Sequence, residues 1–213
     1  MKTIGIILII AVALIYALLR FLRNVQPDDM EVEKDLVELK KSLDSFRGGL
    51  AEWNSGLSSN EVNQIMTKSN QRSGDGVFLS DNGDPVFAYA FKKYIGPGEN
   101  AVMYAMTHTD EYVFRITNKG TSVQVNGQSV GLIRDNERFF DQKNDLKARL
   151  VRNNIKNTSK IFIGDIEAGK IALPKSNMIQ AFEMNESTQS DEDISVAKTL
   201  AIYQLIHSIS ETE

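Results

Sequence analysis

The chain has no cysteine, and its 213 residues include only two histidines, four prolines and one tryptophan. Without cysteine, disulfide bonds, thiol catalysis and thiolate sites for zinc or iron–sulfur clusters are excluded. A histidine-based metal site or a Ser-His-Asp triad is hard to assemble, because His108 and His207 are the only imidazoles. The motifs of phosphate-binding loops, zinc proteases and serine hydrolases are also missing. We therefore expect no cofactor, no metal site and no catalytic residue, and we predict that the protein is not an enzyme.

The charge balance is mildly acidic, with 28 Asp and Glu against 24 Lys and Arg and a formal net charge of −4. Such a protein is not expected to bind nucleic acid, which requires a basic surface. Apolar residues make up 42% of the chain and charged residues 24%, which is ordinary for a folded protein. His108 precedes an acid, Asp110, but a histidine in a surface turn explains this pattern better than a catalytic base does.

Residues 4–19 form a long apolar run without a charge, IGIILIIAVALIYALL. A bilayer core needs roughly 20 helical residues, and residues 3–22 reach that length if Arg20 extends to the headgroups. We predict an uncleaved single-pass transmembrane anchor at residues 1–23, with a cleaved signal peptide as the alternative. Arg20 and Arg23 follow the run, and the positive-inside rule then places the rest of the chain in the cytoplasm. The predicted location is thus a membrane, with the lipid bilayer as a partner.

Residues 24–70 are predicted to form a helical stalk or linker. Apolar residues follow one another at alternating spacings of four and three, which is the pattern of a coiled-coil seam. One interpretation is a parallel coiled coil that joins two copies of the protein, and the other is an amphipathic helix packed on its own domain. Gly48 and Gly49 end this helix, and residues 59–68 are expected to form a second short helix. The seam, a candidate self-association site, consists of Val32, Leu36, Leu39, Leu43, Phe46 and Leu50.

Residues 71–213 are predicted to form a β-rich globular domain. Short runs of β-branched and aromatic residues alternate with turn residues, among them Asn82-Gly83 and Asn126-Gly127, and this is a strong signal for β-hairpins. The pattern is typical of an antiparallel barrel or sandwich. Residues 192–209 differ, because apolar or small residues point in nearly every helical direction. We expect a C-terminal helix there that is buried on most of its surface.

The segments that carry most of this pattern are GVFLSDNGDPVFAYAF at 76–91, VNGQSVGLI at 125–133, IFIGDIEAGKIAL at 161–173 and DISVAKTLAIYQLIHSI at 193–209. In this order they resemble the superfamily of tubby C-terminal domains, phospholipid scramblases and LURP-one-related proteins, over residues 76–210. The resemblance implies a closed antiparallel β-barrel around a central, hydrophobic C-terminal helix. With the transmembrane helix and the stalk helix before it, the expected fold is mainly β with α. A β-sandwich or an α+β domain is the alternative.

One part of this acidic chain is locally basic. Six Lys and Arg lie between residues 143 and 160, with Asp145 as the only acid. Acids from elsewhere that fold back onto this stretch are one interpretation. Contact with anionic lipid headgroups or an acidic partner is the other, each Lys or Arg near such a surface contributing ~1 kcal/mol. Tubby-like domains bind phosphoinositide headgroups through basic residues, although no such motif aligns here. The candidate contact residues are Lys143, Lys147, Arg149, Arg152, Lys156 and Lys160.

Together these features predict a non-enzymatic, membrane-anchored interaction module. Its role would be that of an accessory or scaffolding subunit in a membrane assembly, or of a binder of anionic lipid headgroups. The expected interactions are with the bilayer, with a protein partner in such an assembly, and with a second copy of the chain through the stalk. A scramblase-like lipid-handling protein and an enzyme with an unrecognised site are the alternatives.

Overall fold

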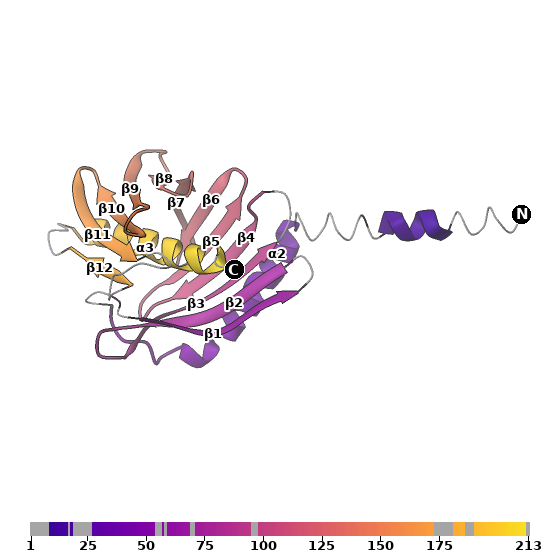
Figure 1. Cartoon of the computed structure of the whole chain (residues 1–213), viewed down its shortest axis with the longest axis horizontal. Helices are drawn as coiled ribbons and strands as arrows, with labels where there is room; N and C mark the ends of the chain where they lie inside the picture. Colours follow the sequence, from indigo (N-terminus) through magenta and orange to yellow (C-terminus); the bar gives the residue numbers. More distant parts are fainter. Residues whose placement is uncertain are drawn as a thin grey trace, which may run out of the picture.

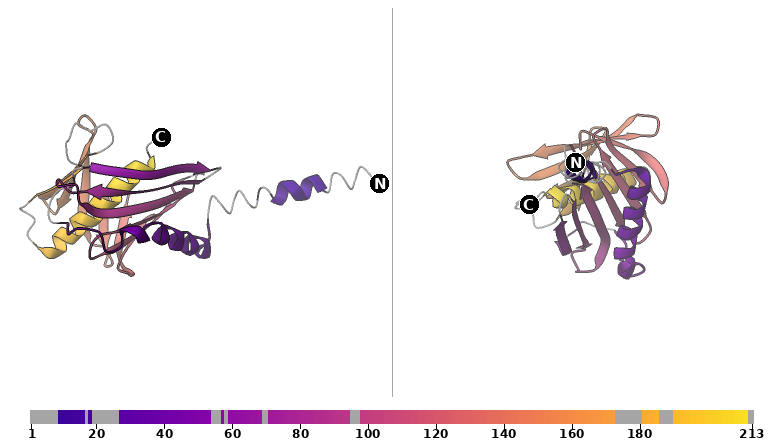
Figure 2. Two further views of the ribbon diagram at one scale, coloured as in Figure 1. Left: turned by 90° about the horizontal axis from the view of Figure 1, so that it is seen from below. Right: turned by 90° about the vertical axis from the view of Figure 1, so that its right-hand side faces the viewer.

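The computed structural model describes residues 9–16, 18, 27–53, 57, 59–68, 71–94, 98–172, 181–185 and 190–211. For residues 59–68 it describes the backbone alone. One antiparallel sheet curls around the C-terminal helix, and a second helix lies on the outside of the sheet (Figure 1 and Figure 2). The main core therefore lies between the concave face of the sheet and the C-terminal helix.

The sheet is a meander, because its twelve strands are hydrogen-bonded in the order in which they follow one another along the chain. Every pair of neighbouring strands is antiparallel. Strands that are adjacent in sequence are thus also adjacent in space. The strands are β1 (Ser59–Lys68), β2 (Gln71–Leu79), β3 (Pro85–Tyr94), β4 (Ala101–Met106), β5 (Glu111–Thr117), β6 (Gly120–Val125), β7 (Gln128–Arg134), β8 (Arg138–Asp141), β9 (Leu146–Asn153), β10 (Thr158–Ile163), β11 (Ile166–Ala172) and β12 (Phe182–Met184).

Turn residues with a left-handed backbone separate several of these strands. Asn126 and Gly127, between β6 and β7, have φ angles of 52° and 76°. Asp135 and Asn136, between β7 and β8, have φ angles of 54° and 58°. Positive φ at consecutive turn residues matches the twist of a hairpin, and Asn, Asp and Gly adopt it at low cost. Local sequence therefore determines where β6, β7 and β8 meet.

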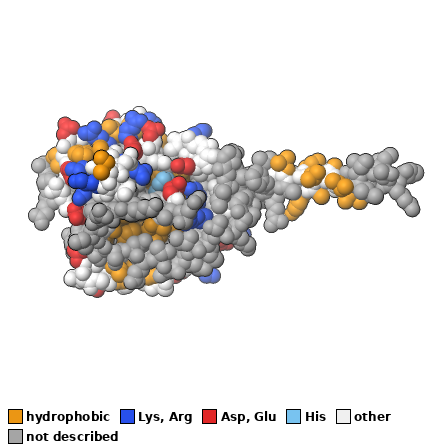
Figure 3. All heavy atoms as spheres, viewed as in Figure 1, with side chains coloured by type: hydrophobic (Ala, Val, Ile, Leu, Met, Phe, Trp, Pro, Cys, Tyr) orange, Lys and Arg blue, Asp and Glu red, His pale blue; other side chains and the backbone are white. Residues whose placement is uncertain are grey.

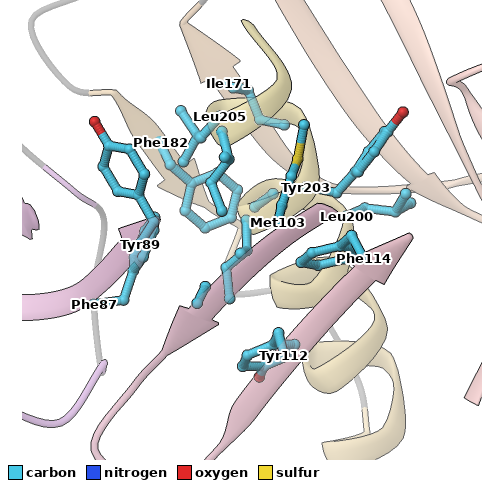
Figure 4. Close-up of a cluster of buried hydrophobic side chains, with 14 of the residues drawn as sticks. Phe87, Tyr89, Met103, Tyr112, Phe114, Ile171, Phe182, Leu200, Tyr203 and Leu205 are labelled. Atoms are coloured by element: carbon cyan, nitrogen blue, oxygen red, sulfur yellow. The ribbon is translucent and has the colours of Figure 1, made fainter. Parts of the chain in front are cut away.

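Helix α3 (Asp191–Glu211) fills the concave side of the sheet. It begins after Ser190, whose Oγ accepts a hydrogen bond from the backbone N–H of Asp193 at 3.1 Å and so satisfies a free helical donor. The helix contacts β2, β3, β9, β10 and β11. Figure 4 shows side chains of α3, among them Leu200 and Tyr203, lying among aromatic side chains of the strands. The buried residues of α3 are Ala197, Thr199, Leu200, Ala201, Ile202, Tyr203, Leu205, Ile206 and Ser210.

The sheet does not close into a barrel, so the predicted tubby-like closed barrel is wrong. In the described part of the chain, β1 pairs with β2 and β12 pairs with β11, and the two edges meet through a single bridge between Leu57 and Phe182. There the N–H of Leu57 donates to the carbonyl of Phe182 at 2.7 Å. β12 has three residues whereas β1 has ten, so β12 is too short to pair along β1. The alternative of two packed sheets is not found among the described residues either, since one sheet contains all twelve of their strands.

Helix α2 (Asp29–Ser42) covers part of the convex face of the sheet, where it contacts β3 and β4. Asp28 caps it, because its Oδ1 accepts a hydrogen bond from the N–H of Glu31 at 2.8 Å. The helix ends at Leu43 and is followed by a 3-10 turn, η1 (Asp44–Phe46). Leu39 and Leu43 are buried against β3 and β4. β3 is therefore covered on both faces, by α3 on the inside and by α2 on the outside.

Among the residues that the structure describes, no helix has the length and apolar character needed to cross a membrane. On this finding the predicted single-pass anchor is wrong, and so is the membrane localisation with a cytoplasmic domain that followed from it. Helical residues are described at 9–16 and 18. The other residues of the predicted span, 3–8, 17 and 19–22, lie outside the described residues.

Residues 59–68 form β1 instead of the expected short helix. The apolar residues of this segment have a helical spacing, but its backbone pairs with β2 from Ser59, opposite Leu79, to Lys68, opposite Gln71. Pairing with an adjacent strand outweighs a weak local preference, since strand formation depends strongly on context. β1 thus belongs to the sheet, although it falls in the range predicted as a helical stalk.

Candidate anion-binding surface

The predicted basic residues lie on β9 and β10 and in the turns beside these strands. Residues 138–172, which contain β8–β11, have eight Lys and Arg against four Asp and Glu. This region has a formal charge of +4 in a chain whose total is −4. In Figure 3, Lys and Arg side chains gather along the top of the domain, with hydrophobic and acidic side chains between them. We call the outer face of β8–β11 the basic surface, with the cations Arg138, Lys147, Arg149, Lys160 and Lys170.

Strand register brings like charges together on the basic surface. Arg138 of β8 is directly opposite Arg149 of β9, and Lys160 of β10 is directly opposite Lys170 of β11. Opposite residues of antiparallel strands project from the same face, and here it is the outer one, because Ile161 beside Lys160 is buried in the core. Like charges in this position destabilise a sheet. Three of these four cations, Arg138, Arg149 and Lys160, have an acidic side chain beside them within the fold, which offsets the repulsion in part.

Acidic side chains lie beside several of these cations and neutralise them in part. The side chains of Arg149 and Lys160 are 48% and 43% exposed, and ion pairs with such exposure contribute ~0–1 kcal/mol each. An anionic ligand can therefore replace an acidic partner at small cost. Acids do fold back onto the basic stretch, as one interpretation of the sequence expected, but the positive excess is retained. The ion pairs are Arg138 with Asp135, Lys147 with Asp141 and Glu192, Arg149 with Asp165, and Lys160 with Glu167.

The turn between β8 and β9 holds a carboxylate in its charged form. Oδ1 of Asp141 accepts hydrogen bonds from the backbone N–H groups of Asp145 and Lys143, both at 2.9 Å. These two hydrogen bonds hold the pKa of Asp141 below its usual range, and the one from Asp145 has the larger effect. Asp141 also lies 3.6 Å from the ammonium of Lys147. Lys147 thus has an acidic partner that backbone hydrogen bonds of the turn hold in place.

The turn between β9 and β10 presents an exposed isoleucine. The exposed fraction of Ile155 is 94%. Oδ1 of Asn153 accepts hydrogen bonds from the N–H groups of Ile155 and Lys156, both at 3.1 Å, and Asn157 has a left-handed φ of 49°. These interactions order the turn. Because Arg152 and Lys156 flank Ile155 in sequence, the turn combines an apolar tip with two of the predicted basic residues.

The predicted self-association seam is covered within the chain. Leu39, Leu43 and Leu50 are buried, and Val32, Leu36 and Phe46 pack beside them in part. The structure thus has the second of the two arrangements considered for the seam, a helix packed on its own domain. The residues that cover the seam are Ala88, Ala90, Val102, Tyr104, Met106 and Val113.

Within the described ranges of the chain, no three or more His, Asp or Glu side chains are grouped to hold a metal ion. Nε2 of His207, on α3, lies 3.8 Å from Oε2 of Glu99, which precedes β4. The hydrogen bond to His207 is the main cause that lowers the pKa of Glu99 to about 2, and the hydrogen bond to Asn136 also lowers it. Burial acts in the opposite direction. The hydroxyl of Tyr203 donates to Oδ1 of Asn136 at 2.8 Å. These contacts attach the C-terminal half of α3 to the turns around it.

Comparison with known proteins gives no relative of this chain. No family model matches it, no curated protein matches it, and no solved structure matches it. The tubby-like resemblance stays a prediction, and the case for a site rests on the residues of this chain alone.

Three residues of the candidate site were missing from the sequence prediction. Arg138 and Lys170 lie outside the basic stretch in sequence and join it only through strand pairing. Their positions depend on register, which a single sequence does not define across bulges such as the one between Ile161 and Phe162. Ile155 did carry a local signal, since it is one apolar residue within the polar segment Asn-Asn-Ile-Lys-Asn.

Proposed function

We propose that this protein is a non-enzymatic binding module whose basic surface docks on anionic phospholipid headgroups. The observation that carries the proposal is that strand register places Arg138 opposite Arg149 and Lys160 opposite Lys170 on one face of the sheet. Acidic side chains of the chain offset these charges only in part, and a membrane with acidic lipids supplies further anionic groups.

The exposed apolar residues of the same region favour a lipid surface over a purely polar anion. Val151 lies opposite Lys160 and is 45% exposed, and Ile155 at the tip is 94% exposed. Transfer of such a side chain from water to an apolar phase contributes ~1.5–3 kcal/mol. Each Lys or Arg near an anionic bilayer contributes a further ~1 kcal/mol. Both kinds of residue act in the same direction only where an apolar interior lies beneath a negative surface.

The experiment uses the absence of cysteine in the chain. Ile155→Cys in the full-length protein gives a single thiol for an environment-sensitive fluorophore, which reports on the turn itself and not on other segments. We expect its fluorescence to rise on vesicles of phosphatidylcholine with phosphatidylserine, and not on phosphatidylcholine alone. The rise should diminish at high ionic strength, because the Debye length falls from ~10 Å at 0.1 M to ~3 Å at 1 M.

Matched variants distinguish binding through the basic surface from non-specific adsorption to vesicles. Arg149→Glu with Lys160→Glu, in the labelled background, should abolish the rise on acidic vesicles. A label at Asn82→Cys, in the exposed turn between β2 and β3, should show no difference between the two vesicle types. Equal signals from Ile155→Cys on neutral and acidic vesicles would rule out the lipid proposal.

A further inference from the structure

A small cavity lies away from the basic surface, where four parts of the chain meet. Its volume is about 150 Å³. The parts are the segment before β1, the turn between β4 and β5, the start of β5, and the N-terminal half of α3. We call it the Lys198 cavity; it is lined by Glu52, Trp53, Thr107, His108, Thr109, Asp110, Tyr112 and Lys198.

A half-buried ammonium forms one side of the Lys198 cavity. Nζ of Lys198 donates a hydrogen bond to the backbone carbonyl of Trp53 at 2.8 Å and lies 5.4 Å from the centre of the Trp53 ring. Burial lowers the pKa of Lys198, although the charge of Asp110 acts in the opposite direction. An ammonium has three N–H donors, and the structure gives one hydrogen bond for them among the described residues. Lys198 can therefore bind a further acceptor, best of all an anionic one.

The turn between β4 and β5 contributes two acceptors to the wall of the cavity. Nδ1 of His108 lies 2.9 Å from the carbonyl of Leu50, and because a carbonyl can only accept, Nδ1 carries the proton. In the neutral ring Nε2 is then an acceptor. The carboxylate of Asp110 is oriented by two donors, the hydroxyl of Thr109 at 2.7 Å and the side-chain amide of Asn126 at 2.8 Å. Two donors leave lone pairs of this carboxylate available for a third.

From this arrangement we infer that the Lys198 cavity binds a small zwitterion of the α-amino acid type. The ligand carboxylate would accept from Nζ of Lys198, and the ligand ammonium would donate to Asp110 and to Nε2 of His108. A liquid water occupies ~30 Å³, so a volume of about 150 Å³ has room for roughly five water-sized groups. Glycine, with five non-hydrogen atoms, matches this size, and alanine and serine are the next larger members of the class. The inference does not depend on the proposed lipid function, because none of the lining residues belongs to the basic surface.

Other small ligands fit the charges less well. A phosphate dianion would meet the carboxylates of Asp110 and Glu52, and like charges in a confined site repel. A metal ion would meet the ammonium of Lys198 in place of a third carboxylate. A zwitterion offers an anionic group to Lys198 and a cationic group to Asp110, and it satisfies donors and acceptors that would otherwise hold water.

The only tryptophan of the chain, Trp53, is part of the cavity wall and reports directly on its occupancy. We expect saturable changes in the fluorescence of the full-length protein with glycine, L-alanine or L-serine, together with a higher melting temperature. Acetate carries the carboxylate of the proposed ligand without its ammonium, and methylamine carries the ammonium without the carboxylate. At equal concentration they should give no saturable change, because each can pair with Lys198 or with Asp110 but not with both.

Variants test the assigned contacts. Lys198→Met keeps the apolar stem and removes the charge, and should weaken amino-acid binding about tenfold or more, as expected for loss of a charge-assisted hydrogen bond. Asp110→Asn, which keeps the shape of the side chain, should have a similar effect and serves if Lys198→Met does not fold. Lys34→Met, at an exposed position of α2, is the control and should bind as the unaltered chain does. Absence of both a fluorescence change and a thermal shift with all three amino acids, or unchanged binding by Asp110→Asn, would overturn the inference.

Discussion

The carboxylate of Asp35, on α2, lies 2.6 Å from the ammonium of Lys92, on β3, and also accepts a hydrogen bond from the hydroxyl of Tyr94. Asp35 is only 4% exposed. Burial, and then the hydrogen bond to Asp35, raises the pKa of Tyr94 well above its ordinary value. The helix is thus attached to the sheet by a buried polar contact as well as by its leucines.

Removal of this carboxylate should therefore loosen α2. Asp35→Ala leaves the charge of Lys92 and the hydroxyl of Tyr94 without their partner, and breaking a buried ion pair in this way costs ~3–5 kcal/mol. The side chain of Lys92 is 18% exposed, so we expect a value near the lower end. Thermal unfolding measures the effect. Glu33→Ala, at an exposed position of the same helix, is the control and should unfold like the unaltered chain.

The seam on α2 should contribute to stability and not to self-association. Leu36→Asp with Leu43→Asp places two carboxylates against the apolar face formed by β3 and β4, and burial of unpaired charge is strongly unfavourable. We expect a lower melting temperature and the same mass in sedimentation as for the unaltered chain. A fall in mass with an unchanged melting temperature would instead support the coiled-coil interpretation.

The sequence predicts those features of the fold whose physical cause lies within one short segment of the chain. The turn at Asn126 and Gly127 could be predicted because a left-handed backbone favours Asn and Gly at those two residues. The C-terminal helix could be predicted because its apolar residues face all directions, which suits a helix inside a curled sheet. β1 could not, since its pairing with β2 is a contact between two segments and its own apolar spacing suggests a helix.

Contacts between distant segments also explain which of the sequence predictions were wrong or incomplete. Closure of the sheet depends on how β12 and β1 meet, and these strands are far apart in the sequence. A four-three spacing of leucines is the same whether they face a second helix or the outer side of β3 and β4. For the candidate site, amino-acid composition alone revealed the basic stretch. The pairing of Lys160 with Lys170 depends on strand register, which composition does not define.

The pKa of Glu99 predicts a loss of stability in acid. Its pKa in the folded chain is about 2, below the ordinary value of 4.5, so the folded state holds its proton less tightly than the unfolded state does. The associated stability is complete above pH 4.5 and is lost as the pH falls from 4.5 towards 2. Because the side chain of Glu99 is 45% exposed, the contribution is small. Glu99→Gln should lower the melting temperature at pH ~6 and have less effect at pH ~3.

Helix α3 should be indispensable to the core. Leu200 is fully buried, and Leu200→Ala should cost ~2–5 kcal/mol through lost burial and the cavity left behind. Ser195→Ala, at an exposed position of α3, is the matched control and should leave stability nearly unchanged. A chain that ends after Asp191 lacks the helix and should not unfold cooperatively. A sharp thermal transition of this shorter chain would show that the sheet folds without α3.

The like-charge pairs allow stability and lipid binding to be separated. Lys170→Gln removes one charge from the pair with Lys160, and relief of a like-charge contact across strands should stabilise the fold by ~0.2–1 kcal/mol. The same change removes a cation from the basic surface, so the fluorescence rise of the Ile155→Cys label on acidic vesicles should decrease. Lys34→Gln, at an exposed position of α2, removes an equal charge elsewhere and should change neither property. Higher melting temperature with weaker vesicle response in Lys170→Gln alone would mean that this charge is retained for binding at the expense of stability. A lower melting temperature with an unchanged vesicle response would mean that Lys170 serves the fold, and the case for the basic surface would lose its main support.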